Sequence, residues 1–130
     1  MDQCVIFFHG TPSDAAIWTD WLALLETASM GAIAFSRPGY GGSTRRIARQ
    51  VADINKDVIE IIDAFGVDKF VAVGWSGGGP HALASVAVPQ CVGVIALASL
   101  SPFVRSKPES TESIIFPSWS SHVLMRSVGI

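Results

Sequence analysis

The sequence predicts an α/β fold in which helices cover both faces of a parallel, four-stranded sheet. Short runs rich in apolar and β-branched residues alternate with segments whose apolar residues recur at helical spacing. Strands buried between two layers of helices have this apolar character. Hydrophobic residues make up 49% of the 130 residues and the mean hydropathy is +0.43, which suits such strands. The alternation indicates one domain with right-handed crossovers.

The first half of the chain supplies two strands and the helix between them. Residues 1–8 form the first predicted strand, and Ser13 or Asp14 can cap the helix that follows. Gly31 ends this helical region, and residues 32–35 form the second strand. The helix residues that we expect in the core are Ile17, Trp18, Trp21, Leu24, Leu25 and Ala28.

The second half begins with a long helix, predicted over residues 46–65 and ended by Gly66. Charged side chains occupy most of its surface, and its apolar side carries Val51, Ile54, Val58, Ile61, Ile62 and Phe65. A further helix is predicted over residues 77–88, where Pro89 halts it, and residues 93–98 form the fourth strand.

A strand, a tight turn and a helix meet at residues 74–78, which read GWSGG. The third predicted strand, residues 69–74, runs into this G-x-S-x-G pattern. A Cβ at the flanking positions would clash where strand and helix nearly touch, so we expect a strained backbone at Ser76 that lifts its hydroxyl clear of the sheet. The free N–H groups at the helix start, that of Gly77 among them, can stabilise negative charge beside this hydroxyl. Pro80 suits the first helical turn.

Two further loops follow predicted strands upstream, HGTP at residues 9–12 and SRPGYGGS at residues 36–43. Together with GWSGG, and in this order, they resemble the α/β-hydrolase superfamily, most of all its esterase and proline-iminopeptidase-like branch. The resemblance runs from about residue 5 to about residue 102. It implies an incomplete α/β-hydrolase fold, three-layered and Rossmann-like, with the strands in the spatial order second, first, third, fourth. The loops of Thr11 and Ser76 would then lie side by side at the carboxyl ends of the strands.

The resemblance implies a serine hydrolase that acts on an ester or amide through an acyl-enzyme on Ser76. The family's second oxyanion-hole donor is the N–H after the His-Gly pair, which here is Thr11, paired with Gly77. We expect His9 to pack or hydrogen-bond in this loop rather than to act as a base. Trp75 either lines the pocket or is buried. The residues that support these loops by resemblance are His9, Gly10, Gly74, Trp75 and Gly78.

The base that must accept the serine proton is the missing part of this chemistry. In the family the acid and then the histidine follow the nucleophile on loops after later strands. After Ser76 this chain offers as acids Glu109 and Glu112, and as histidines His81, which follows the turn too closely to reach back, and His122. We therefore expect a fragment that carries the nucleophile and the oxyanion hole without the base.

Two departures from the family pattern concern structure. Ser36 stands where the family usually has Asp, so a carboxylate bond that stiffens this loop should be lost or weakened. The chain also begins at the family's third strand and stops near its sixth, which predicts two open sheet edges through which copies can associate. We expect residues 1–101 to form the core, and residues 102–130 to begin a lid or to be a frayed tail, with a helix near residues 122–128.

Composition excludes several other classes of protein. A net charge of −2 and a pI near 5.8 argue against nucleic acid or an anionic membrane as the main partner. No apolar stretch spans a membrane and the N-terminus lacks a secretory signal, so we expect a cytoplasmic protein. Cys4 and Cys91 read as reduced core residues, and neither a metal nor a cofactor is implied. A catalytically silent fragment that associates, or a lyase or small-ligand receptor on the same fold, remains an alternative.

Overall fold

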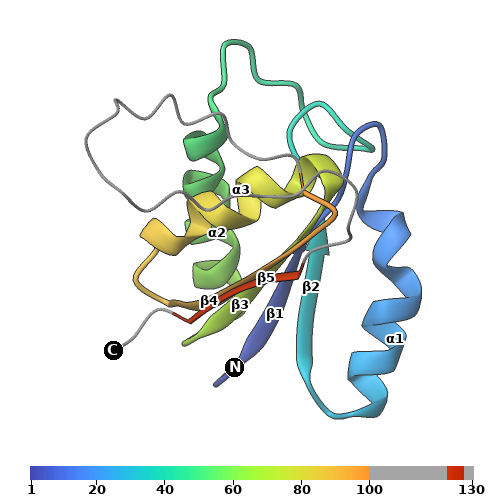
Figure 1. Cartoon of the computed structure of the whole chain (residues 1–130), viewed down its shortest axis with the longest axis vertical. Helices are drawn as coiled ribbons and strands as arrows, with labels where there is room; N and C mark the ends of the chain where they lie inside the picture. The colour runs from blue at the N-terminus through green and yellow to red at the C-terminus, as the bar shows by residue number, and fades with distance from the viewer. Residues whose placement is uncertain (100–122, 128–130) are drawn as a thin grey trace.

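The computed structural model describes residues 1–99 and the backbone of residues 123–127. Five strands form one sheet in the order β2-β1-β3-β4-β5 (Figure 1). The first four are parallel, and their order confirms the predicted topology. The strands are β1 (Cys4–Phe8), β2 (Gly31–Phe35), β3 (Phe70–Trp75), β4 (Cys91–Leu97) and β5 (Val123–Ser127).

Helices cover both faces of this sheet, as predicted. In Figure 1, α1 lies on one face and α2 and α3 lie on the other. The α-helices are α1 (Thr19–Thr27), α2 (Ile54–Phe65) and α3 (Gly79–Ala84), and the short 3₁₀ turns are η1 (Ala15–Trp18), η2 (Val51–Asp53), η3 (Ser76–Gly78) and η4 (Ser85–Ala87). Within the described ranges, none of these helices has the length and apolar character needed to cross a membrane.

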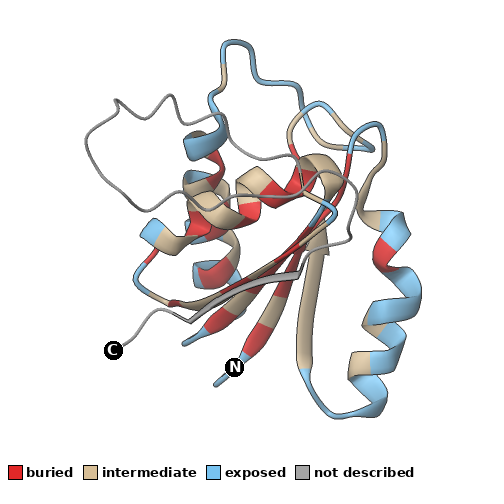
Figure 2. Ribbon diagram, viewed as in Figure 1, coloured by how far each residue is buried: buried red, intermediate tan, exposed pale blue. Residues whose placement is uncertain are grey.

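The core has two parts, one on each face of the sheet. Successive side chains of a strand point to opposite faces, so Ile6 and Phe8 pack towards α2 and α3 whereas Phe7 packs towards α1. The α1 side is the thinner part, and its centre is Phe7 stacked on Trp18 with ring centroids 4.6 Å apart. Figure 2 shows that most of the buried residues lie in the central strands and on the inner sides of α2 and α3.

The predicted core face of the first helix is partly wrong. Trp18 is buried as expected, but Ile17, Trp21 and Leu24 are 40%, 51% and 61% exposed. The residues that contact the sheet are Trp18 and Leu25, as expected, and Leu22, which is not among the predicted core residues. The helix begins with the tighter 3₁₀ turn η1, which shifts the phase of the residues that follow. The predicted cap is confirmed at Asp14, whose carboxylate accepts the N–H of Ala16 at 2.8 Å.

The long second helix begins later than predicted. Residues 46–50 lie outside it, because the Asp53 carboxylate accepts the N–H of Gln50 at 2.8 Å and fixes the start at η2. Gly66 ends it with a φ of +62°, as predicted. Of the six residues expected on its apolar side, Ile54, Val58 and Ile62 are buried, Ile61 is half-buried, and Val51 and Phe65 are exposed.

The expectation of a helix near residues 122–128 is wrong. The backbone of β5 instead pairs antiparallel with β4, from Leu97 opposite Val123 to Gly93 opposite Ser127. The fourth strand would otherwise present a row of unpaired N–H and C=O groups, and β5 satisfies them. The predicted open edge at β4 is therefore covered, and the edge strands of the described sheet are β2 and β5. The rest of the predicted lid lies outside the described residues.

Candidate active site

Three loops converge at one end of the sheet because the strands before them end at the same level. Phe8 is in register with Phe35 on one side and with Gly74 on the other. The loops that follow β1, β2 and β3 consequently gather at the upper end of the sheet in Figure 1. This is the edge at which open parallel sheets bind ligands.

Ser76 has the strained backbone that the turn predicts. Its φ is +50°, in the left-handed region that residues with a side chain rarely adopt. The flanking glycines explain how the turn fits: a Cβ on Gly74 would lie 2.5 Å from the carbonyl oxygen of Gly78, and a Cβ on Gly78 would overlap the carbonyl oxygen of Phe8. Ser76 as a residue is half-buried.

The helix after Ser76 is less regular than predicted. Three short turns, η3, α3 and η4, replace one helix over residues 77–88, and α3 has only six residues. Glycine has a low helix propensity, and the consecutive glycines at residues 77–79 account for the irregular 3₁₀ start of this segment. Pro80 lies in the first turn of α3, as expected.

Thr11 and Gly77, the two predicted donors, lie directly against each other. A Cβ on Gly77 would be 2.8 Å from Oγ1 of Thr11 and 3.3 Å from its backbone nitrogen. Within residues 1–99, no backbone or side-chain acceptor is bonded to the N–H of Thr11. The Thr11 N–H therefore has no acceptor in this part of the chain, although its nitrogen lies close to Gly77.

His9 is a buried, neutral support of this loop. Its Nδ1 lies 2.7 Å from the Gly10 carbonyl oxygen, and its Nε2 accepts the N–H of Arg37 at 2.9 Å. The carbonyl can only accept, so Nδ1 carries the proton. Burial lowers the pKa of His9 and the Arg37 charge adds to that effect, although the bond to Gly10 opposes it. The imidazole has no nitrogen left to act on Ser76.

His81 is similarly engaged on both ring nitrogens. Its Nδ1 lies 3.0 Å from the Gly77 carbonyl oxygen and its Nε2 lies 3.4 Å from Nη1 of Arg37. Burial, with the Arg37 charge adding to it, lowers the pKa of His81 to about 4. Neither histidine of the described part is thus poised as a base. His122, Glu109 and Glu112 lie outside the described residues.

Arg37 is the site residue that the sequence interpretation missed. It is 6% exposed, its Nη2 donates to Oγ1 of Thr11 at 3.1 Å, and its guanidinium lies 4.8 Å from the ring centroid of Tyr40. The available signal was its place in a Gly- and Pro-rich loop that follows a strand at the same sheet edge. Its neighbour Ser36 stands where the family usually has Asp. The hydroxyl oxygen of Ser36 still stabilises the loop, because it accepts a hydrogen bond from the N–H of Ala15 at 3.1 Å.

Trp75 is exposed rather than buried. It is 42% exposed, and a Cβ on Gly10 would lie 2.8 Å from its ring atom Cε3. The indole therefore covers Gly10 and faces solvent beside Ser76, where a bound ligand would meet it.

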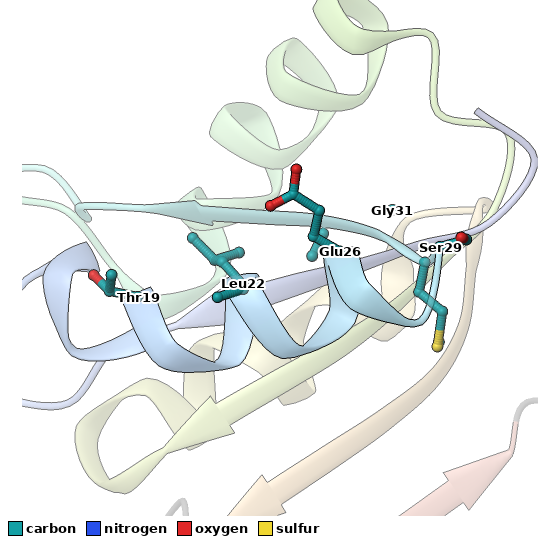
Figure 3. A pocket seen from close by; sticks show the side chains of 8 residues that line it. Thr19, Leu22, Glu26, Ser29 and Gly31 are labelled. Carbon is teal, nitrogen blue, oxygen red and sulfur yellow. The ribbon is translucent and has the colours of Figure 1, made fainter.

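A separate hollow lies away from this site. It has a volume of about 600 Å³ and lies between α1 and β2 (Figure 3). Its lining includes Thr19, Leu22 and Glu26 of α1 and Gly31 of β2. None of its lining residues belongs to the three converging loops. It is not a candidate active site.

Comparison with known proteins places this geometry in a family. Residues 3–121 match the alpha/beta hydrolase fold family. Epoxide hydrolase B of Mycobacterium tuberculosis (strain ATCC 25618 / H37Rv) is 26% identical over 98 residues, which are 72% of this chain and 28% of that protein. Among solved structures, Paleococcus ferrophilus monoacylglycerol lipase aligns with a TM-score of 0.63 and 26% identity, over 74% of this chain and 38% of that one. Est816, an N-acyl homoserine lactone degrading enzyme, aligns with a TM-score of 0.65 and 26% identity, over 76% and 39%.

The chain thus spans less than a third of the length of the curated relative and about two fifths of each solved structure. The family match nevertheless covers most of the chain itself, and the strand order is the one that the resemblance implies. The chain belongs to the alpha/beta hydrolase fold family.

Proposed function

We propose that this chain is the nucleophile-bearing part of a serine hydrolase that cleaves a carboxylic ester or amide. The observation that carries the proposal is the left-handed backbone of Ser76, at φ +50°, in a turn that packs Gly77 against Thr11. The loops that carry Ser76, Gly77 and Thr11 follow β3 and β1, which end in register at the carboxyl end of the sheet.

The reaction follows from these groups. Oγ of Ser76 attacks the substrate carbonyl carbon while its proton passes to a base, and the carbonyl oxygen becomes an anion held by the N–H groups of Thr11 and Gly77. The bond to the alcohol or amine then breaks as the base returns its proton to the leaving group. Water hydrolyses the acyl-enzyme by the same steps. Each oxyanion donor lowers the barrier by about 3 kcal/mol in comparable sites.

We propose that the base and its orienting acid come from outside the described residues, as in an incomplete hydrolase. His9 and His81 have both ring nitrogens engaged, and the chain spans 28% of a curated relative. Residues 1–101 would then be the partial catalytic core and residues 102–130 the start of a lid. A cytoplasmic location remains part of this proposal.

An ester or amide suits Ser76 better than an epoxide does. A serine oxygen that opened an epoxide would form an ether, which water does not readily cleave, so the enzyme would not turn over. A carboxylate nucleophile would form a hydrolysable ester instead. The names of the two solved relatives mention a lactone and a monoacylglycerol, and both are carboxylic esters. These names support an ester as the substrate class of this chain.

A second candidate function is association rather than catalysis. Strand β2 is a sheet edge, and the neighbouring helix α1 exposes Trp21 and Leu24. A silent fragment could use this face to assemble. A single stoichiometry in sedimentation, together with the absence of Ser76 acylation, would favour it over hydrolysis, and polydisperse aggregation would count against it.

The test of the main proposal is covalent labelling of Ser76. A fluorophosphonate should label the wild-type chain slowly and stoichiometrically, with the adduct found on Ser76 by peptide mass spectrometry, and Ser76→Ala should remain unlabelled. The same chain should turn over a nitrophenyl ester far more slowly than a version extended to supply the base. Labelling that persists in Ser76→Ala would show that another residue reacts, and it would contradict the proposal.

A further inference from the structure

One carbonyl oxygen beside Ser76 accepts four hydrogen bonds. The Gly10 oxygen lies 2.7 Å from Nδ1 of His9 and 3.4 Å from Nη2 of Arg37, and it also accepts from Oγ and the N–H of Ser13 at 2.9 and 3.3 Å. This oxygen belongs to the same peptide group as the N–H of Thr11. In a planar trans peptide the C=O and N–H point in opposite directions, so donors gathered on the oxygen fix where the N–H points. They also polarise the amide and strengthen its N–H as a donor.

Arg37 is the one charged member of this group. Its Nη2 also reaches the His9 carbonyl oxygen at 3.2 Å and Oγ1 of Thr11 at 3.1 Å. Within the described residues no carboxylate forms an ion pair with it, and its Nε has no hydrogen-bond partner. A cation that is 6% exposed and lacks a counter-charge costs folding free energy. A stabilising ion pair therefore does not explain its position.

The second arm of the same guanidinium reaches the other loop. Nη1 of Arg37 lies 3.4 Å from Nε2 of His81, and Nδ1 of His81 lies 3.0 Å from the Gly77 carbonyl oxygen. A guanidinium can only donate hydrogen bonds, so Nε2 of His81 is the acceptor. Nδ1 of His81 therefore carries the hydrogen and donates a hydrogen bond to the Gly77 carbonyl oxygen. One side chain thus connects the loop of Thr11 with the loop of Gly77.

We propose that Arg37 is the positioning residue of the oxyanion hole. It holds the Gly10–Thr11 peptide directly and, through His81, the carbonyl end of Gly77, and it adds positive charge next to the loop of Thr11. The inference rests on the proposed function, since it assigns Thr11 and Gly77 as the donors. A lysine keeps the charge but lacks the fork that reaches two loops, so Arg37→Lys should preserve only part of the effect.

The test compares Arg37→Met and Arg37→Lys with Arg45→Met, a matched change at an exposed arginine further along the same loop. For each variant the fluorophosphonate reaction, in which Oγ of Ser76 displaces fluoride from phosphorus, is separated into reversible binding and the phosphonylation rate constant. We expect Arg37→Met to slow phosphonylation about 10- to 100-fold with little change in binding, and Arg37→Lys to slow it less. Arg45→Met should match the wild type. A role confined to stability would lower the melting temperature without this selective loss.

A second readout does not depend on catalysis. The amide NMR resonances of Thr11 and Gly77 should shift, and their hydrogen exchange should quicken, in Arg37→Met but not in Arg45→Met. If the wild type is not labelled on Ser76 by the fluorophosphonate, the proposed hydrolase fails while these resonances still decide the role of Arg37. If Arg37→Met does not fold, Arg37→Lys is measured in its place. A folded Arg37 variant with unchanged resonances and an unchanged phosphonylation rate would overturn the inference.

Discussion

A Cβ atom placed on Gly77 would lie 2.8 Å from Oγ1 of Thr11, so the two residues touch with no room between them for a side chain. A contact of that length does not persist, and one of the two loops has to move. Thr11 sits in an exposed loop whereas Gly77 is held between β3 and α3, so Thr11 is the residue that yields. The distance that both N–H groups must share with one oxygen would then increase.

We therefore expect Gly77→Ala to slow phosphonylation of Ser76 by a fluorophosphonate about 10- to 100-fold and to change the free energy of unfolding by less than about 1 kcal/mol. The fluorophosphonate labelling rate and urea unfolding measure the two effects. Gly42→Ala is the matched control, since a Cβ there meets nothing within 4 Å, and it should leave both quantities unchanged. Equal labelling rates for the two variants would contradict the assignment of Gly77.

The strain at Ser76 should be measurable as stability. A left-handed backbone costs a residue with a Cβ about 1 kcal/mol relative to glycine. Ser76→Gly should thus unfold at higher denaturant than Ser76→Ala, by about 1 kcal/mol in free energy, even though neither variant can be acylated. Ser29, which has a φ of +56° outside the site, is the reference for this comparison. The free energy of unfolding of Ser29→Gly should exceed that of Ser29→Ala by a similar amount. If glycine gains nothing at position 76, the turn is not strained.

The phase of α1 can be tested with two tryptophans. Trp18 is 4% exposed and stacks on Phe7, whereas Trp21 is 51% exposed. We expect Trp18→Ala to lower the free energy of unfolding by about 3 kcal/mol or more, and Trp21→Ala to lower it by less than about 1 kcal/mol. If the two variants lose comparable free energy of unfolding, measured by thermal or urea unfolding, then Trp21 is in the core as the sequence periodicity indicates, and the phase of α1 in the structure is wrong.

The contrast between these residues shows what sequence patterning could predict. The predicted helix stop at Gly31 is wrong, because α1 ends at Thr27 and Gly31 is the first residue of β2. The strand order, the helix stop at Gly66 and the glycines around Ser76 follow from local rules of backbone sterics and from the resemblance. The phase of α1 does not, because η1 changes the residues per turn before the helix begins. Nor does the pairing of β5 with β4, a contact between distant segments in which an unsatisfied edge overrides local helical character.

Arg37 marks the same limit within the site. The sequence places it in a loop, but its hydrogen bonds go to His9, Thr11 and His81, which are brought together only when three strands align. Residues that act across loops are therefore found from the structure, whereas Ser76, Thr11 and Gly77 could be proposed from motifs alone.

His81 should make the stability of the chain depend on pH in a defined window. Burial, aided by the charge of Arg37, lowers its pKa to about 4, against an ordinary value of 6.5 that applies to the unfolded chain. Between these values the unfolded chain binds a proton that the folded chain does not, so stability falls as pH falls through this range and is fully present above it. The loss should be on the order of 1–2 kcal/mol, because partial exposure of His81 weakens the effect. His9, whose pKa burial also lowers, acts in the same direction. Urea unfolding between about pH 5 and 7 should therefore show a slope that His81→Gln reduces, and an equal slope in both proteins would mean that His81 titrates normally.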